Sequence, residues 1–288
     1  MKIAVTGSRG LVGQRLIAHL SDAGHEVVRL PHDSPDLQAL LSGVDGIVNL
    51  GGAPIAGGRW TTARKRLIYD SRVSLTRQLV DAIAKMPEDK RPRVLVSASA
   101  AGIYGIESKG LRNESSPPGD DFLARVCLAW EGETRRAESL GVRTVQVRIT
   151  LVVAREALAL KRMLLPFRLG VGGPLGSGSQ PFPFIHIDDL CQLFALALHD
   201  DTLRGPVNAA APEQLQQRAA ARAIGRVLGR PTWLPVPALA LQILFGEMSS
   251  VLLTGQFVSS ELAQAHGLVF RYPTFEAAVR ETIKPGVG

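Results

Sequence analysis

The sequence predicts an α/β protein built on a doubly wound parallel sheet, followed by a smaller, mostly helical C-terminal lobe. Two observations predict this fold class. Short apolar runs alternate with amphipathic helical runs through the first 150 residues, and a glycine-rich octet follows directly after the first apolar run. Apolar strands separated by helices are typical of a parallel sheet whose two faces are both covered.

The order of these runs predicts each element in turn. We expect strands at 2–7, 25–30, 45–52, 92–99 and 143–150, and helices at 11–24, 61–86 and 120–130. After residue 150 the alternation loosens. A helix near 157–168, a loop rich in Gly, Ser and Pro, a strand at 184–187, a helix at 188–199 and a short strand within 205–212 are expected there. We therefore predict a first domain over 1–154, joined again by 184–210, and a smaller lobe made from 155–183 and 211–288.

Composition and charge argue against several classes of protein. No run approaches the roughly 20 apolar residues that a membrane span needs, and a strand begins at residue 2 where a signal peptide would stand. Cys127 and Cys191 fall on apolar helix faces, which favours buried thiols in a cytoplasmic protein. The net charge is +7, but the arginines are scattered and no zinc spacing occurs. We expect no membrane, nucleic acid or metal partner.

The octet TGSRGLVG at 6–13 carries the most specific signal in the chain. It places Gly7, Gly10 and Gly13 between a strand and a helix. Glycines at this spacing allow a tight turn, a close approach to a pyrophosphate, and close helix–strand packing, as in Rossmann dinucleotide sites. A turn without a ligand is the alternative. The predicted cofactor contacts are Gly7, Ser8, Arg9, Gly10, Leu11, Val12 and Gly13.

Charges near the end of the second strand favour NADP over NAD. A site selective for NAD usually ends this strand with a carboxylate that binds the ribose 2′-hydroxyl. Here Arg29 and His32 follow instead, and Arg9 lies within the glycine loop. Basic groups suit the 2′-phosphate of NADP. Asp33 lies close enough to supply the missing acid, so NAD remains possible.

Five further segments carry a family resemblance. They are APIAGGRWT (53–61), DSRVSLTRQLVDAI (70–83), PPGDDFLA (117–124), RLGVGGPLGSG (168–178) and HIDDL (186–190). With the glycine loop, they make nearly the whole chain resemble the atypical "epimerase family" branch of the extended short-chain dehydrogenase/reductases, kin to nucleotide-sugar epimerases. The resemblance implies a nicotinamide cofactor bound across the sheet edge and a small-molecule substrate in a cleft between the lobes. It also implies a homodimer formed through the helices at 61–86 and 120–140.

The resemblance assigns further cofactor contacts residue by residue. Leu50, Gly51 and Gly52 match the segment that passes along the cofactor in that family. Ser97 and Arg148 are assigned to the same site. In the substrate lobe, Gln180 of the Gly-rich loop is expected to contact the ligand.

The catalytic part of the family pattern is incomplete. Ser99 is the better match to the family's catalytic Ser, but the usual Tyr and Lys are replaced by Phe122 and Val126. Phenylalanine has no proton to transfer, and valine has no charge to bind a ribose or lower a tyrosine pKa. Tyr104 follows the same strand end and is a candidate substitute, although packing against its loop is the alternative. His186 is a candidate base, and Asp188 is expected to cap the helix after it.

Two functions remain open from the sequence. The first is an NADP-linked oxidoreductase or epimerase that acts on a nucleotide sugar, or on a related polar alcohol or ketone, with Ser99 and Tyr104 assisting hydride transfer. The second is a dinucleotide-binding sensor or scaffold without turnover, which Phe122 and Val126 favour. The glycine loop fits both functions.

Overall fold

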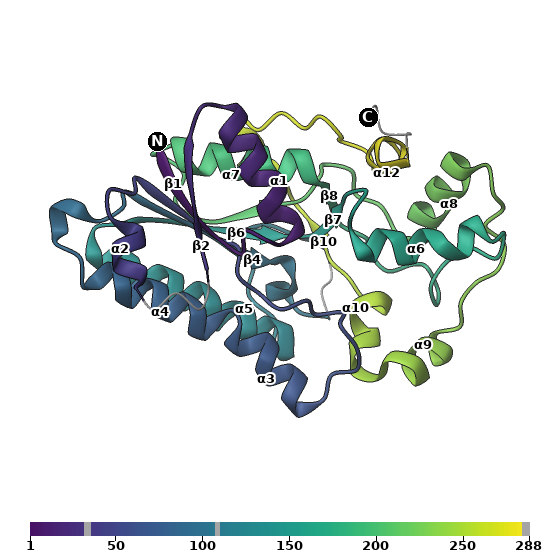
Figure 1. Cartoon of the computed structure of the whole chain (residues 1–288). Coiled ribbons are helices and arrows are strands. Elements are labelled where there is room, and N and C mark those ends of the chain that lie inside the picture. Colours follow the sequence, from purple (N-terminus) through teal and green to yellow (C-terminus); the bar gives the residue numbers. More distant parts are fainter. Residues whose placement is uncertain (32–35, 107–109, 284–288) are drawn as a thin grey trace.

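The core of the protein is a parallel sheet of six strands in the order β2-β1-β3-β4-β6-β9 (Figure 1). The computed structural model describes residues 1–31, 36–106 and 110–283. The strands are β1 (Lys2–Thr6), β2 (Glu26–Leu30), β3 (Gly46–Asn49), β4 (Val94–Ala100), β6 (Arg143–Ile149) and β9 (Gly205–Ala209). Every neighbouring pair in this sheet is parallel. The predicted fold class is confirmed.

Helices cover both faces of the sheet (Figure 1). They are α1 (Leu11–Asp22) and α7 (Ile187–His199) on one face, and α2 (Leu37–Leu41), α4 (Val73–Ala84) and α5 (Phe122–Arg135) on the other. The strands serve both layers because their side chains alternate. Ile3 and Val5 pack in one core cluster with Leu20 of α1, while Ala4 between them packs in another with Leu79 of α4.

The prediction of one helix over 61–86 is wrong. The structure has two helices, α3 (Thr62–Asp70) and α4, with a break at Ser71 and Arg72. Ser71 Oγ accepts a hydrogen bond from Ala53 N at 2.9 Å and donates to Ile68 O at 3.2 Å. The bond from Ala53, 18 residues earlier in the chain, holds the start of α4 against the segment that follows β3. The start of α4 is therefore placed at the carboxyl edge of the sheet.

The remaining elements lie mainly to one side of the sheet (Figure 1). Among them are α6 (Leu158–Arg168), α8 (Gln217–Leu228), α9 (Ala238–Phe245), α10 (Ser250–Leu253), α11 (Glu261–Ala265) and α12 (Phe275–Ile283). Two small parallel sheets pair β7 (Leu151–Val153) with β8 (Phe184–His186), and β5 (Leu111–Arg112) with β10 (Phe257–Val258). The 3-10 helices are η1 (Glu88–Lys90), η2 (Ala101–Tyr104), η3 (Arg136–Leu140) and η4 (Gly246–Ser249). The exact domain division stays a prediction.

Both cysteines lie in packed helices. Cys127 of α5 and Cys191 of α7 are buried free thiols, and burial raises the pKa of each to about 12. A thiol with such a pKa stays protonated at neutral pH and packs as a small apolar side chain. Within the described ranges, no helix has the length and apolar character needed to cross a membrane.

We expect Arg143→Met to destabilise the protein. The buried Arg143 guanidinium donates to the carbonyl oxygens of Ala197 at 2.9 Å, Leu198 at 3.1 Å and Leu203 at 2.9 Å, at and just beyond the end of α7. Losing this charged donor should lower the free energy of unfolding, measured with urea, by about 2–4 kcal/mol. Arg93→Met is the control, because its side chain is 72% exposed. Equal losses in both variants would contradict a capping role for Arg143.

Candidate functional site

A cavity of about 340 Å³ lies at the carboxyl edge of β1 and β3. Parallel sheets of this class bind ligands at this edge, where the direction of the strand order reverses. Its lining residues are Thr6, Gly7, Ser8, Arg9, Gly10, Leu30, Pro31, Leu37, Asn49, Gly51, Gly52, Ala53, Ser71, Leu75, Gln78 and Leu79. Of the other predicted loop contacts, Leu11, Val12 and Gly13 form the first turn of α1.

The backbone around the glycine loop leaves no room for a side chain at Gly7 or Gly13. Gly7 has φ +63°, and a Cβ there would stand 2.7 Å from the carbonyl oxygen of Leu50. A Cβ at Gly13 would stand 2.3 Å from the carbonyl oxygen of Gly7. The helix that follows begins without a side-chain cap at Gly10, so its first N–H groups are available to a ligand. This loop fits the pyrophosphate of a dinucleotide.

A buried asparagine, which sequence reasoning missed, fixes the floor of the cavity. Asn49 Oδ1 accepts from Thr6 Oγ1 at 2.7 Å, and its Nδ2 donates to Thr76 Oγ1 at 2.8 Å and Ser97 Oγ at 3.1 Å. Thr6 Oγ1 in turn accepts from Leu50 N at 3.0 Å. The network ties β1, β3, β4 and α4 together at the floor of the cavity. Ser97 is fully buried within it, and its predicted contact with the cofactor stays a prediction.

Of the residues predicted to decide between NADP and NAD, the structure describes Arg9 and Arg29. Arg9 is exposed and lines the cavity. Arg29 is also exposed, but it is not among the lining residues. His32 and Asp33 lie outside the described residues. Of the described residues in this set, Arg9 lies at the cavity, and its role in selecting NADP stays a prediction.

Ser99 lies in a buried ion-pair network beneath the sheet edge. Arg148 of β6 donates from Nε to Glu131 Oε1 at 2.9 Å and from Nη2 to Oε2 at 3.0 Å. Ser99 Oγ donates to the same Oε1 at 2.8 Å. Burial would lower the pKa of Arg148, but its bonds to Glu131 outweigh burial and raise it. The guanidinium is thus held permanently charged against α5, and Glu131 is a residue that sequence reasoning missed.

Tyr104 belongs to the same network. Its hydroxyl donates to Asn208 Oδ1 at 2.6 Å and accepts from Arg148 Nη1 at 3.0 Å. Burial raises the pKa of Tyr104, so the phenol stays neutral. These contacts give Tyr104, Ser99 and Arg148 structural partners within the protein. Their predicted roles in catalysis and cofactor binding stay predictions.

The first turn of α5 shows what replaces the usual acid. The ring of Phe122 packs edge-on against Trp60, with 5.3 Å between ring centroids, and Lys65 Nζ lies 5.1 Å from the Phe122 centroid. Lys65 Nζ also pairs with Glu247 Oε2 of η4 at 2.6 Å, so α3 is tied to the C-terminal segment here. Val126 is buried one turn later. At these two positions α5 presents apolar side chains, and neither of them can donate a proton.

Gln180 is directed toward backbone groups. Its Nε2 donates to the carbonyl oxygens of Leu175 at 3.1 Å and Leu252 at 3.0 Å. These bonds join the Gly-rich loop to α10. The predicted contact between Gln180 and a substrate stays a prediction.

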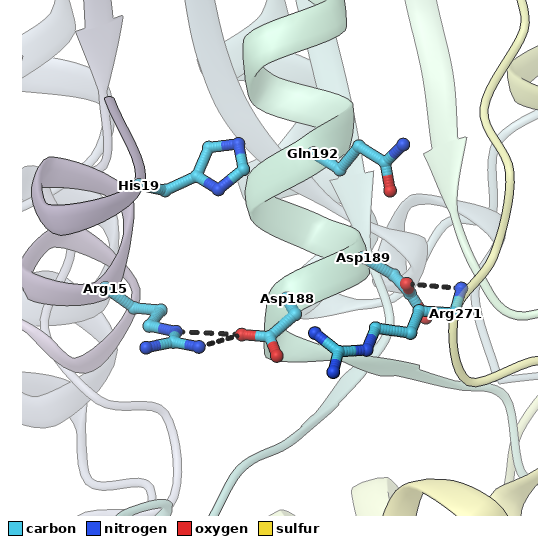
Figure 2. A pocket seen from close by; sticks show the side chains of 6 residues that line it. All are labelled: Arg15, His19, Asp188, Asp189, Gln192 and Arg271. Atoms are coloured by element: carbon cyan, nitrogen blue, oxygen red, sulfur yellow. Dashed lines mark hydrogen bonds and ion pairs between the residues drawn. The ribbon is translucent and has the colours of Figure 1, made fainter. Parts of the chain in front are cut away.

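A second cavity of about 170 Å³ lies between α1 and α7 (Figure 2). Arg15 Nη2 pairs with Asp188 Oδ1 at 2.6 Å, and Asp189 accepts from the backbone N of Arg271 at 2.8 Å and of Tyr272 at 3.1 Å. Asp189 therefore fixes the C-terminal segment onto α7. Because Asp188 and Asp189 are both bound to groups of the protein, we interpret this second cavity as a contact region between α1, α7 and the C-terminal segment. Among the residues that the structure describes, no three metal-binding side chains gather anywhere.

The expected cap at Asp188 is wrong. His186 is the N-cap of α7, and its Nδ1 accepts from Asp188 N at 3.2 Å. Its ring lies 3.9 Å from the ring of Tyr272 between centroids. Burial lowers the pKa of His186 to about 4, so the ring is neutral and free to accept this bond. The start of the helix could be predicted from the sequence, but the side chain that accepts from the free N–H could not.

Removing one partner of the buried pair should destabilise the fold strongly. We expect Glu131→Met to lower the free energy of unfolding by about 3–5 kcal/mol, because Arg148 would be left buried without its carboxylate. The double variant Glu131→Met/Arg148→Met should recover most of that loss. Glu133→Met is the control, since its partners Arg77 and Arg136 lie at the surface. A double variant as unstable as the single one in urea unfolding would contradict this account.

Comparison with known proteins places this architecture in a family. Residues 3–210 match the model of the NAD dependent epimerase/dehydratase family, and residues 236–282 match a domain of unknown function, DUF1731. The chloroplastic SDR39U1 homolog of Arabidopsis thaliana, an epimerase family protein, is 37% identical over 97% of this chain and 86% of its own length. Epimerase family protein YfhF of Bacillus subtilis is 34% identical over 98% of each chain.

Two solved structures share both fold and sequence. Human epimerase family protein SDR39U1, solved with NADPH, superposes with a TM-score of 0.87 at 32% identity over 98% of this chain and 99% of its own. A nucleoside-diphosphate sugar epimerase from Corynebacterium glutamicum gives 0.77 at 30% identity over 97% of this chain, which spans 57% of that protein. With its glycine loop and cavity, the chain belongs to the NAD dependent epimerase/dehydratase family.

Proposed function

We propose that this protein binds NADP and acts with it as an oxidoreductase or epimerase on a nucleotide sugar, or on a related polar alcohol or ketone. NAD is the possible second cofactor. The observation that carries the proposal is the glycine loop at the cavity, whose backbone fits a pyrophosphate. It is supported by the human relative solved with NADPH and by the Corynebacterium protein described as a nucleoside-diphosphate sugar epimerase.

The chain's own groups would bind and orient the dinucleotide. The first N–H groups of α1 would face its phosphates, and Arg9 would face the 2′-phosphate. Apolar side chains of Leu30, Leu37 and Leu79 line the cavity and would exclude water around the adenine. When bound, the nicotinamide would supply hydride transfer.

Cations near Trp60 suit a substrate that carries a diphosphate. The Arg64 Nη2 donates to the carbonyl oxygen of Pro54, which holds the guanidinium against the loop after β3. Arg59 lies against Gly246 of the C-terminal segment, with Nε 3.2 Å from the position of a Cβ there. Arginine pairs well with phosphate oxygens because its donors form a rigid fork. The proposed substrate cleft runs between these two segments.

A cofactor-binding protein without turnover is the second candidate. Ser99 donates to Glu131, Tyr104 donates to Asn208, and Phe122 replaces the usual acid. Loss of a general acid–base costs about 10²–10⁴ in rate. These contacts favour a sensor or scaffold unless another side chain, or the substrate itself, supplies the proton.

Gly13→Ala should weaken NADPH binding. The added methyl group would meet the Gly7 carbonyl and displace the loop, so the dissociation constant from fluorescence titration should rise about tenfold or more. Gly132→Ala is the control, because nothing lies within 4 Å of a Cβ at that helical position. Unchanged NADPH binding in Gly13→Ala would remove the dinucleotide from this loop.

The unaltered protein should convert at least one member of a panel of nucleotide sugars and simple ketones or alcohols. The panel is incubated with NADP⁺, NADPH, NAD⁺ or NADH, and products are followed by nicotinamide absorbance and by NMR for epimers. Gly13→Ala should lower any activity found at limiting cofactor concentration. Tight NADPH binding without conversion of any member would favour the sensor or scaffold.

A further inference from the structure

Most of the large apolar side chains that the described chain leaves exposed lie in two segments of the C-terminal lobe, 158–171 and 233–244. We call these side chains the apolar lobe surface. They are Leu158, Leu165, Leu169, Val171, Trp233, Leu234, Leu239, Ile243 and Leu244. Exposed apolar residues that gather in one region of a protein mark a surface that binds a partner.

The two segments are joined by their backbones. Gly176 N donates to Val236 O at 2.8 Å, and Val236 N donates to Pro174 O at 2.8 Å. A Cβ at Gly173 would stand 2.0 Å from the carbonyl oxygen of Leu234. The end of α6 and the chain that leads from α8 to α9 therefore lie side by side, on the side of the lobe away from the large sheet (Figure 1).

Helix α9 is apolar but mostly unpacked. Of its eight residues, only Leu241 is buried. Leu239 and Ile243 lie one turn apart on the helix and are 65% and 68% exposed. A helix of this length draws its stability from packing, so the exposed side of α9 suits an apolar medium.

The same part of the lobe carries cations without carboxylates. Residues 157–187 and 214–246 contain no Asp or Glu. Their cations are all exposed and are Lys161, Arg162, Arg168, Arg218, Arg222, Arg226 and Arg230. Arg226 pairs with Glu276 of α12. The formal net charge of +7 is thus carried by these two segments, while the acidic and basic residues of the rest of the chain balance.

An anionic lipid surface fits this combination of groups. Segments that lie in the membrane interface bury leucine and isoleucine at the boundary of the acyl chains, while lysine and arginine extend to the lipid phosphates. Tryptophan is favoured at the level of the headgroups, and Trp233 is 68% exposed. The expectation of no membrane partner follows from the lack of a run that could span a bilayer, and an interfacial surface needs no such run.

Two other partners fit less well. A nucleic acid would pair with the cations but would leave the exposed leucines in water. A second copy of the chain would bring the same cations against one another, because a twofold contact places the same surface on both sides. Charge and hydrophobicity therefore favour lipid over both.

We propose that the apolar lobe surface binds peripherally to an anionic lipid bilayer. Trp233 and α9 enter the headgroup region, and the cations of the two segments contact lipid phosphates. This binding is separate from the cavity at the glycine loop and does not depend on the proposed function.

The test measures how the protein partitions onto sedimented vesicles. One set contains phosphatidylcholine alone, and the other contains equal parts of phosphatidylcholine and phosphatidylglycerol. We expect a partition coefficient at least about tenfold higher on the anionic vesicles at low salt, and a lower one at high salt. The emission of Trp233 should shift to shorter wavelength on the anionic vesicles, and Trp233→Phe should remove that shift.

Apolar variants test the part played by α9. Ile243→Gln should lower the partition coefficient about 5- to 10-fold, and Leu239→Gln/Ile243→Gln about 30- to 100-fold. Val269→Gln is the matched control, because Val269 is 74% exposed but lies outside the two segments. It should leave the partition coefficient unchanged, and all these variants should keep the melting temperature of the unaltered protein.

Charge variants test the part played by the cations. Lys161→Gln/Arg168→Gln should lower binding to the anionic vesicles about 10- to 30-fold at low salt. Arg66→Gln/Arg93→Gln is the control, because it removes two exposed cations elsewhere on the molecule. It should change binding by less than about twofold.

Several results would overturn the proposal. The protein might fail to sediment with anionic vesicles, or might bind both vesicle types equally. The control variants might lower binding as much as the variants of the two segments. A dimer that Leu239→Gln/Ile243→Gln converts to a monomer without lipid would assign the surface to a second copy. A salt-sensitive shift of DNA without vesicle binding would assign the cations to nucleic acid.

Discussion

The bidentate ion pair between Glu131 and Arg148 is the interaction on which the rest of the site depends. It joins α5 to β6 in the interior, and through Ser99 and Tyr104 it reaches β4 and the end of η2. A buried pair of this kind is not a large source of stability by itself, because desolvation of both ions offsets their attraction. Its effect is positional: each neighbouring polar group must point at it or lose its hydrogen bond.

Polar side chains at the ends of the strands are hydrogen-bonded within the protein, some of them by this ion pair and others by Asn49. Ser97 is bound by Asn49, Ser99 by Glu131, and Tyr104 by Asn208 and Arg148. In this structure the three hydroxyl groups are hydrogen-bonded to other side chains of the protein. The cavity is bordered by the glycine loop and by Gly51 and Gly52, together with residues that carry side chains, such as Arg9 and Leu75. Free backbone N–H groups at the start of a helix suit the phosphate oxygens of a dinucleotide.

Helix α5 lies where the family pattern places it, but Phe122 and Val126 stand at the positions of the usual Tyr and Lys. Phe122 and Trp60 form an aromatic contact at its first turn, with Lys65 above the Phe122 ring. Other cations lie close by in the chain: Arg72 directly precedes α4, and Arg59 belongs to the loop after β3. The first turn of α5 thus carries an aromatic ring with a cation above it where the family pattern has its acid. The link between Lys65 and Glu247 ties that arrangement to the C-terminal segment.

The sequence by itself determined the order of strands and helices, the parallel sheet and the glycine loop. These features are local, since hydrophobic period and the steric freedom of glycine act over a few neighbouring residues. Tertiary structure decided the partners of the polar side chains. Tyr104 and Asn208 are 104 residues apart, and the break at Ser71 depends on Ala53. The periodicity of the sequence does not predict which distant group a buried hydroxyl or guanidinium will contact. That partner depends on which groups are buried together once the chain has folded.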